Sequence, residues 1–500
     1  MRHRFVRDQK GNREVRFPAS RDRRGATMAD HHLMIIGAER VDADATTEVR
    51  SPYDGRVLGT VPTGTTDHLD AAVTTARETL NAGVLPTHER AAILDRLATA
   101  LSNRSEEFAQ SISAEAAKPI TTARGEAARA VDTARFSAAV ARTLGGDVIP
   151  MDASSAGEGK TGFVKRVPIG VVGAITPFNF PLNLVCHKVA PAIAAGCPLV
   201  LKPASATPLT ALLLARTLLE ECGLPSGWIN VVTCPGRTAD HLVTHDDVAM
   251  ITFTGSPVVG WEIRARAPKK KVSLELGNNS PIVIEPDVDP ATVAARISPA
   301  AFAYAGQTCI SAQRLYVHDD IAEAFTEALA AEASTLVVGD PSDPVTDLSS
   351  LIDAEETERV MSWIDEATAT GARLVCGGMV DEGVITPTVL ADVTDDMRVS
   401  SVEVFGPVVS IATYCDYEEA LRRANASDYG LQAAVFTNDL AKALRSAEVL
   451  HYGAVMVNEV PTWRADHMPY GGLRDSGNTR EGPAYAVREM TEERLIVIQS

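Results

Sequence analysis

The chain has 500 residues, of which 45% are hydrophobic and 22% are charged, as in ordinary globular proteins. This length exceeds what one hydrophobic core usually organises, so we expect two or more domains. A formal net charge of −18 argues against nucleic acid or an anionic membrane as the main partner. The chain also lacks an apolar run of the ~18 residues that a membrane-spanning helix needs, so we expect no membrane contact.

The cysteines and the N-terminal residues bear on the cellular compartment. The seven cysteines are scattered and odd in number, show no CxxC spacing and form no cluster with histidine that resembles a zinc site. We therefore expect free thiols, no bound metal and a cytoplasmic location. Residues 1–27 are rich in Lys and Arg and lack the apolar segment of a secretory signal. They predict a disordered extension before Met28; a basic arm with its own partner is the alternative.

The first part of the chain predicts β-structure, then helices, then a hairpin. Residues 44–62 are β-rich and punctuated by turns. An Ala- and Arg-rich region follows over 66–144, with apolar positions at helical spacing. Residues 147–166 have the pattern of two strands around a Ser/Gly-rich turn, which predicts a projecting hairpin.

Apolar strands then alternate with Ala-rich helices, which is the pattern of a parallel α/β sheet. The predicted strands are 171–175, 198–201, 229–232 and 250–253, and the predicted helices are 187–194, 208–222 and 238–244. A further apolar stretch, 272–284, is interrupted at 277–281, where we place a domain boundary. A second alternation follows, with helices at 290–305, 320–335, 353–369 and 416–425, strands at 313–318 and 407–413, and a β-rich tail at 494–498.

Three motifs lie at strand ends of the first alternation, where ligands bind in doubly wound sheets. Asn179, between two prolines, offers an amide to a developing oxyanion, although a rigid turn explains it equally well. Lys202 suits a nucleotide phosphate or ribose; a surface lysine is the alternative. Ser256 precedes a predicted helix whose first backbone amides would bind phosphate, although the chain lacks the GxGxxG fingerprint.

Glu275 and Cys309 are candidate catalytic groups. Glu275 places a carboxylate inside an apolar strand, where burial would raise its pKa toward that of a general base; a structural ion pair is the alternative. Cys309 follows Gly306 among small, hydroxylated neighbours, which indicates a tight backbone that presents the sulfur in a cleft. A thiol attacks carbonyls only as thiolate, so a catalytic cysteine needs a nearby base or a lowered pKa. A buried structural cysteine is the alternative.

Together these motifs resemble those of the aldehyde dehydrogenase superfamily over about residues 41–500. The most specific are Leu-Glu-Leu-Gly at 274–277, Gly-Gln-Thr-Cys at 306–309 and Thr-Pro-Phe-Asn-Phe-Pro at 176–181, supported by residues 202–203, 253–256, 403–407 and 469–472. The resemblance implies an α/β fold with a Rossmann-like cofactor domain, an α/β catalytic domain and a β oligomerisation element.

The same resemblance implies the domain limits. The cofactor-binding domain would comprise residues 28–147 and 167–277, and the catalytic domain residues 278–477. Residues 148–166 and 485–500 would form the oligomerisation element. An apolar tail strand is an aggregation-prone edge unless it pairs with another subunit, so we predict a homodimer or homotetramer.

The resemblance also implies the roles of the site residues. Cys309 would attack the aldehyde to form a thiohemiacetal, and the Asn179 amide with the Cys309 backbone N–H would hold the oxyanion. After hydride transfer to the nicotinamide, Glu275 would activate water to hydrolyse the thioester. The implied coenzyme contacts are Thr176, Pro177, Phe178, Lys202 (adenosine ribose), Ser205, Gly255, Ser256 (pyrophosphate), Glu403 (nicotinamide ribose) and Phe405 (nicotinamide).

Departures from the family pattern bear on the coenzyme. Ser205 stands where many NAD-specific members have Glu. A carboxylate there repels a 2′-phosphate, whereas Ser205 beside Lys202 can accept one, so we expect NADP or NAD with NADP favoured. Asn278 replaces the second Gly after the catalytic Glu, so the family pattern does not predict the backbone conformation near Glu275. Phe178 replaces the usual Trp.

Several segments in the C-terminal half bear on the substrate. Residues 309–314, 480–482 and 489–492 resemble a subgroup that acts on small polar aldehydes, such as the lactaldehyde, succinate semialdehyde and phosphonoacetaldehyde dehydrogenases. The family places substrate-tunnel side chains, often aromatic, in the loop that precedes Pro469. Trp463 and Arg464 are therefore candidate substrate contacts, with Arg464 meeting a carboxylate or similar anion; a salt bridge from Arg464 to Asp466 is the alternative.

We therefore predict an NAD(P)-dependent enzyme that oxidises a small polar or anionic aldehyde to the acid. A CoA-acylating dehydrogenase or acyl-phosphate reductase is the alternative, which Glu275 disfavours because acylating relatives generally lack that base. A non-catalytic protein on the same scaffold is a third reading. The presence of Cys309, Asn179 and Glu275 disfavours it.

Overall fold

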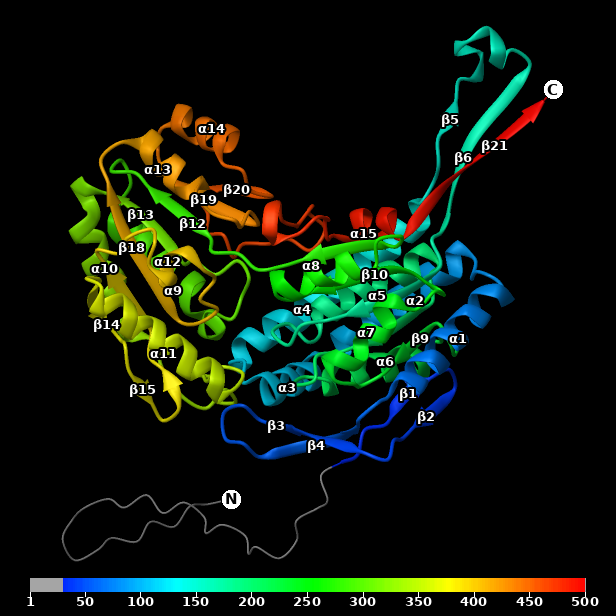
Figure 1. Ribbon diagram of the computed structural model, residues 1–500, viewed down its shortest axis with the longest axis horizontal. Coiled ribbons are helices and arrows are strands. Elements are labelled where there is room, and N and C mark those ends of the chain that lie inside the picture. Colours follow the sequence, from blue (N-terminus) through cyan, green and yellow to red (C-terminus); the bar gives the residue numbers. More distant parts are fainter. Residues whose placement is uncertain (1–29, 500) are drawn as a thin grey trace, which may run out of the picture.

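Two large sheets and one small sheet organise the described part of the chain, residues 30–499 of a computed structural model (Figure 1). The predicted extension, 1–27, lies outside the described residues. Each large sheet has seven strands, and the small sheet has three. Two ribbons complete the β-structure: β3 (Thr46–Arg50) with β4 (Val57–Pro62), and β15 (Val380–Asp381) with β16 (Val384–Ile385).

The first large sheet has the strand order β11-β10-β7-β8-β9-β1-β2. Its strands are β7 (Val171–Ile175), β8 (Leu199–Lys202), β9 (Ile229–Val231), β10 (Val248–Thr254), β11 (Lys271–Glu275), β1 (Met34–Ile36) and β2 (Glu39–Val41). Strands β7 to β11 pair in parallel, which confirms the first predicted alternation. The antiparallel edge strands β1 and β2 are not predicted, because three residues are too few for an alternation to be visible.

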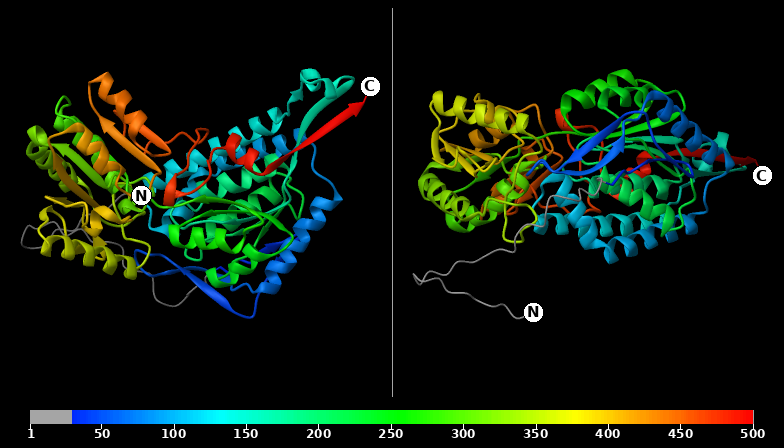
Figure 2. Two further views of the ribbon diagram at one scale, coloured as in Figure 1. Left: turned by 45° about the horizontal axis from the view of Figure 1, so that its top comes forward. Right: turned by 90° about the horizontal axis from the view of Figure 1, so that it is seen from below.

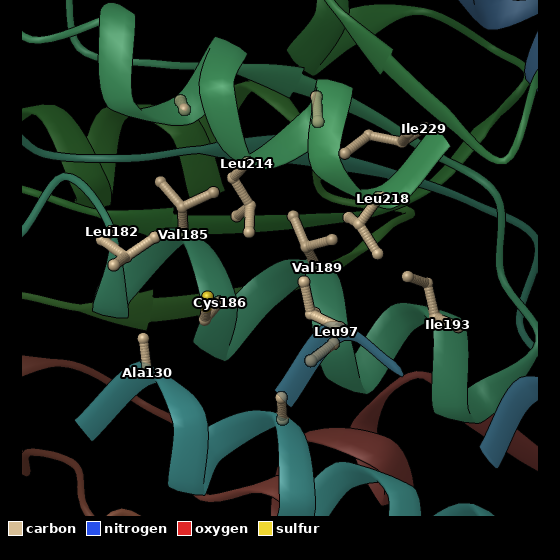
Figure 3. Close-up of a cluster of buried hydrophobic side chains, with 14 of the residues drawn as sticks. Leu97, Ala130, Leu182, Val185, Cys186, Val189, Ile193, Leu214, Leu218 and Ile229 are labelled. Atoms are coloured by element: carbon tan, nitrogen blue, oxygen red, sulfur yellow. The ribbon is translucent and has the colours of Figure 1, made fainter. Parts of the chain in front are cut away.

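Helices cover both faces of this sheet. They are α1 (Thr66–Ala82), α2 (Thr87–Asn103), α3 (Ser105–Ala116), α4 (Ile120–Thr143), α5 (Asn183–Ala195), α6 (Leu209–Glu220), α7 (Gly236–Thr244) and α8 (Pro257–Arg266). Helix α5 packs against α2 and α4 and is buried along its whole length. Leu97, Val189 and Leu218 join these helices to α6 in one apolar core (Figure 3). A separate apolar cluster joins α1, α7 and α8 to the sheet.

The second large sheet has the strand order β14-β17-β18-β13-β12-β19-β20. Its strands are β12 (Pro281–Ile284), β13 (Arg314–His318), β14 (Arg373–Cys376), β17 (Thr388–Ala391), β18 (Val408–Tyr414), β19 (Gln432–Phe436) and β20 (Ala454–Val457). Its helices are α9 (Pro290–Phe302), α10 (Ala322–Thr335), α11 (Ala354–Ala369), α12 (Arg398–Ser401), α13 (Tyr417–Asn425) and α14 (Leu440–Val449). All strand pairs are parallel except β14 with β17.

The second half differs from the predicted pattern in one helix end and in several short elements, since β14 to β17 and α12 are not predicted. The helix predicted to reach 305 ends at Phe302, because Tyr304 and Ala305 adopt positive φ angles that a helix excludes. The elements β19, α14 and β20 are not predicted. The predicted boundary at 277–281 lies between β11 and β12, which belong to different sheets; the domain limits themselves stay a prediction.

The small sheet confirms the predicted hairpin and tail strand. Its order is β21-β6-β5, with β21 (Thr491–Gln499), β6 (Lys160–Pro168) and β5 (Val148–Ile149). Strand β21 follows α15 (Pro483–Glu489) and pairs antiparallel with β6 along its full length. This sheet projects from the body, as the further views in Figure 2 also show. Within residues 30–499, no helix is long and apolar enough to cross a membrane.

Candidate active site

Two cavities meet at the Cys309 side chain. The first, of about 470 Å³, is lined by α4 and by residues 462–481, and we call it the α4 cavity. The second, of about 550 Å³, lies at the carboxyl ends of β7, β8, β10 and β11, and we call it the sheet-edge cavity. Residues shared by both linings are Leu184, Thr254, Glu275, Leu276 and Cys309. The sulfur is therefore accessible from two sides by two different molecules.

A strained turn presents Cys309 at this junction. Tyr304, Ala305 and Gly306 have φ angles of 52°, 53° and 69°, all in the left-handed region. A Cβ atom at Gly306 would lie 2.2 Å from the Gly406 carbonyl oxygen, so only glycine fits there. Strain of this kind persists only where the surroundings hold it, and it is frequent at functional sites.

The sulfur itself lies in a low-polarity environment with one hydroxyl contact. Burial raises the pKa of Cys309 to about 12, and a hydrogen bond with Tyr470 is the largest effect that opposes it. The two side-chain atoms, Sγ and the Tyr470 Oη, are 2.9 Å apart. Catalysis by this thiol therefore needs donors or positive charge near the sulfur.

Asn179 lies beside the strained turn. It is buried, follows β7, and its Nδ2 donates to the Gln307 carbonyl oxygen over 2.9 Å. Its own carbonyl oxygen accepts a hydrogen bond from Lys118 Nζ at 2.6 Å. One amide N–H of Asn179 is thus occupied, and the second remains to bind an oxyanion.

Glu275 ends β11 and faces both cavities. Its side chain is buried, and neither carboxylate oxygen has a hydrogen-bond partner among the described residues. Burial raises the pKa of Glu275 well above its usual value, and the nearby Glu481 carboxylate adds to this, while Arg464 and Lys188 oppose it. An unpartnered carboxyl of raised pKa suits a general base that takes a proton from water.

All nine predicted coenzyme residues line the sheet-edge cavity. They are Thr176, Pro177, Phe178, Lys202, Ser205, Gly255, Ser256, Glu403 and Phe405. Ser256 is the N-cap of α8 and lines the cavity, so this helix begins at the cavity wall, where its first amides could bind a phosphate. Burial lowers the pKa of Lys202, which indicates an ammonium held largely out of water. The rings of Phe178 and Phe405 meet edge to face, with centroids 5.9 Å apart.

Glu403 approaches the chain just after Glu275. A Cβ atom at Gly277 would lie 2.1 Å from Glu403 Oε2, so glycine is required at that position. The Asn278 backbone N–H donates to Glu403 Oε1 over 3.0 Å, and burial raises the pKa of Glu403 to about 8. The Asn278 side chain is itself anchored, because its Nδ2 donates to Ser280 and to the Gln432 carbonyl oxygen. Asn278 therefore stabilises the backbone beside Glu275.

The structure separates the two predicted substrate contacts and corrects one alternative. Arg464 lines the α4 cavity, whereas Trp463 does not and its side chain is half exposed. The expected salt bridge from Arg464 to Asp466 is wrong: Arg464 pairs with Glu481 over 2.9 Å. Asp466 instead accepts two hydrogen bonds from Arg129, which points at it from α4.

Three residues of the site are not predicted from the sequence. Arg129 lines the α4 cavity, Tyr470 contacts the sulfur, and Lys118 supports Asn179. Arg129 belongs to an Arg-rich helical region in which nothing marks one arginine. Lys118 offers a weak signal, because it is a lone cation before a proline within an apolar helical stretch.

One group of possible metal ligands lies outside the two cavities. The Nε2 atoms of His241 and His245 lie 2.5 and 3.3 Å from the same Asp70 oxygen, close enough to share an ion. The His245 Nδ1 accepts the Asp247 backbone N–H, which leaves the proton of the neutral ring on Nε2, toward Asp70. The His241–Asp70 hydrogen bond and the His245–Asp70 contact account for this group without an ion.

Comparison with known proteins identifies the family. The model of the aldehyde dehydrogenase family matches residues 40–496. The chain is 46% identical over 452 residues to 3-sulfolactaldehyde dehydrogenase from Priestia aryabhattai, covering 90% of this chain and 94% of that protein. Aldehyde dehydrogenase 21 from Physcomitrella patens, solved with the reaction product succinate, has a TM-score of 0.91 at 39% identity, covering 94% and 98% of the two chains. This protein therefore belongs to the aldehyde dehydrogenase family.

A third relative bears on the coenzyme. NADP-dependent glyceraldehyde-3-phosphate dehydrogenase from Bacillus halodurans C-125, solved with NADP, has a TM-score of 0.91 at 34% identity, covering 94% of this chain and 99% of that one. The predicted α/β fold of this family and the prediction of an aldehyde-oxidising enzyme are confirmed. The roles of individual residues remain predictions.

The contact between Gly277 and Glu403 predicts the effect of one added methyl group. Gly277→Ala should displace the Glu403 carboxylate from the sheet-edge cavity and weaken coenzyme binding by about tenfold, the equivalent of one charged hydrogen bond. Titration with NADP, followed by fluorescence, measures this. Gly339→Ala is the control, because a Cβ there meets only an ordinary contact at 3.5 Å. Equal affinities in the two variants would contradict the role of Glu403.

Proposed function

We propose that this protein oxidises a small anionic aldehyde to its carboxylic acid with NADP or NAD, using Cys309 as the nucleophile. One observation carries the proposal: Cys309 and Glu275 line both cavities where these meet, and Asn179 lines the sheet-edge cavity and is hydrogen-bonded to Gln307, two residues before Cys309. Cys309 and a nicotinamide in the sheet-edge cavity would then both reach the carbonyl carbon of an aldehyde in the α4 cavity.

Each of the three residues has the chemistry that its step requires. The Cys309 thiolate forms a bond to the carbonyl carbon, and the π electrons move to the oxygen, where the free N–H of Asn179 donates. Glu403 and Phe405 would hold a nicotinamide in the sheet-edge cavity, which would supply the acceptor for the hydride that leaves this carbon as the oxyanion electrons re-form the C=O bond of the thioester. Glu275 then removes a proton from water as the water attacks the thioester, and the carbon–sulfur bond breaks to return Cys309.

The sheet-edge cavity fits a dinucleotide with a 2′-phosphate. Lys202, Ser205 and the start of α8 all line it. Asp240 lines it too, but its carboxylate is paired with Arg266 over 2.8 Å. A 2′-phosphate would thus meet an ammonium and a hydroxyl rather than an unpaired carboxylate, which supports NADP as the favoured coenzyme.

The α4 cavity fits an aldehyde that carries an anion. Arg129 and Arg464 both line it. The Nε of Arg464 is buried and has no hydrogen-bond partner among the described residues, so a donor is left for a ligand. Arg129 is anchored by Asp466, and its side chain remains 32% exposed. Two guanidinium groups at one cavity suit a carboxylate, sulfonate or phosphate.

The small sheet supports a dimer or a dimer of dimers. Strand β21 carries Leu495, Val497 and Ile498, each about half exposed on a sheet that projects from the body. Exposed apolar strands of this kind are usually covered by another subunit.

The seven cysteines are all free thiols, which is consistent with a reducing cytoplasm.

Cys309 and Glu275 should separate the two chemical stages. Cys309→Ala should abolish turnover, whereas Glu275→Gln should keep the first burst of reduced coenzyme and slow steady-state hydrolysis about 100-fold or more. Stopped-flow measurement of coenzyme reduction distinguishes them. Normal turnover by Cys309→Ala would refute the mechanism, and acyl-CoA instead of acid in the presence of CoA would favour the acylating alternative.

Arg129 should select for the anion. Arg129→Gln should lower kcat/KM for succinate semialdehyde about 10- to 100-fold relative to an uncharged aldehyde of equal length, since a charged hydrogen bond is lost. Arg135→Gln, on the same helix with a side chain 62% exposed, is the matched control. An equal fall for both aldehydes would argue against anion recognition by Arg129.

Ser205 should set the coenzyme preference. Ser205→Glu should lower the ratio of kcat/KM with NADP to kcat/KM with NAD by about tenfold or more, because a carboxylate repels the 2′-phosphate. Parallel assays with both coenzymes measure the ratio. A ratio unchanged by the substitution would mean that the 2′-phosphate binds elsewhere.

A further inference from the structure

Tyr470 contacts the reacting sulfur, and the mechanism above gives it no role. Its Oη lies 2.9 Å from Cys309 Sγ, and the residue is only 3% exposed. No other side-chain hydrogen bond to this sulfur occurs within residues 30–499. The phenol is therefore the one described side chain that can exchange a hydrogen bond with the nucleophile.

The chemistry of the two groups decides which one donates. Either atom can donate while Cys309 is a thiol. Burial raises the pKa of Tyr470 well above its usual value, so the phenol keeps its proton at neutral and mildly alkaline pH. A thiolate has no proton to give. In the reactive form, therefore, the Tyr470 O–H donates and the Cys309 sulfur accepts.

The charged groups around the sulfur divide into two sets. The Arg464 guanidinium favours the thiolate, while the Glu403 and Glu275 carboxylates oppose it. The Arg464 guanidinium carbon also lies 3.8 Å from the centroid of the Tyr470 ring. A cation on the ring face draws electron density from the phenol, which makes its O–H a stronger hydrogen-bond donor. Arg464 and Tyr470 therefore act on the sulfur in the same direction.

The position of Tyr470 is tightly held by its own backbone. Its N–H donates to the Glu481 carbonyl oxygen over 3.2 Å, and the Glu481 N–H donates back to the Tyr470 carbonyl oxygen. The Glu481 side chain in turn holds Arg464. One residue thus anchors both the phenol and the guanidinium, which keeps the hydroxyl directed at Cys309.

We propose that Tyr470 is a further catalytic residue, whose hydroxyl donates a hydrogen bond to the Cys309 sulfur and favours the thiolate that attacks the aldehyde. The role rests on the proposed function only in the identity of the electrophile, because the hydrogen bond acts on the sulfur before any substrate binds. The competing explanation is a purely structural tyrosine whose hydroxyl contacts the sulfur without affecting its ionisation. Only the first explanation predicts a change in Cys309 ionisation.

The test is Tyr470→Phe, which keeps the ring and removes the hydroxyl. The pKa of Cys309 should rise by about one unit. Because burial already places this pKa at strongly alkaline pH, the change is followed below that pH, through the rate of alkylation of Cys309. The thiolate fraction below that pH then falls about tenfold. Alkylation of Cys309 by iodoacetamide, followed by mass spectrometry, should fall only about threefold, because a less acidic thiol gives a more nucleophilic thiolate.

Tyr485→Phe is the matched control, since this half-buried tyrosine lies outside both cavities. It should leave ionisation and alkylation of Cys309 unchanged. Thermal unfolding of each variant checks that the fold is kept. A folded Tyr470→Phe protein with the ionisation of the parent overturns the proposal, even if its turnover is reduced.

The same measurements separate this inference from the proposed function. Failure of the parent protein to oxidise any aldehyde, together with a shifted Cys309 ionisation in Tyr470→Phe, would refute the function and keep the role of Tyr470. Cys309-dependent aldehyde oxidation with an unshifted ionisation would do the reverse.

Discussion

The geometry of the site depends on one buried ion pair, Lys118 with Glu126. Both side chains are fully buried, and Lys118 Nζ also donates to the Asn179 carbonyl oxygen. Glu126 accepts the backbone N–H groups of Leu182 and Asn183, so it caps the start of α5. Breaking such a pair by removing one partner destabilises a protein by about 3–5 kcal/mol, because the other charge is left buried. The pair thus holds Asn179 and the start of α5 in one arrangement.

The same lysine connects this arrangement to the strained turn. Its ammonium lies 3.7 Å from the centroid of the Phe180 ring and 4.5 Å from that of Tyr304, the first of the residues with positive φ before Cys309. Cation–aromatic contacts out of water are among the stronger of their kind. Asn179, which follows β7, and the turn that leads to Cys309 are therefore held by one common charge, although Asn179 and Cys309 are 130 positions apart in the sequence.

Much of this could be predicted from the sequence, because local patterns carry it. The parallel strands of the first sheet are short apolar runs that alternate with Ala-rich helices, and Asn179, Glu275 and Cys309 lie in motifs that stand out within a few residues. Contacts between distant segments leave no such pattern. A salt bridge from Arg464 to its neighbour Asp466 was one of the two alternatives for Arg464, but the fold brings Glu481 to Arg464 and Arg129 to Asp466. The contact of Tyr470 with the sulfur is hidden for the same reason.

The junction of two cavities at one sulfur has a consequence for the order of events. The two linings share only a few residues around Cys309. In the proposed reaction the aldehyde and its acid would occupy the α4 cavity and the dinucleotide the sheet-edge cavity, so neither molecule would have to pass the other to arrive or depart. Release of the acid and exchange of the coenzyme would then be sterically independent, and their order would follow from relative affinities.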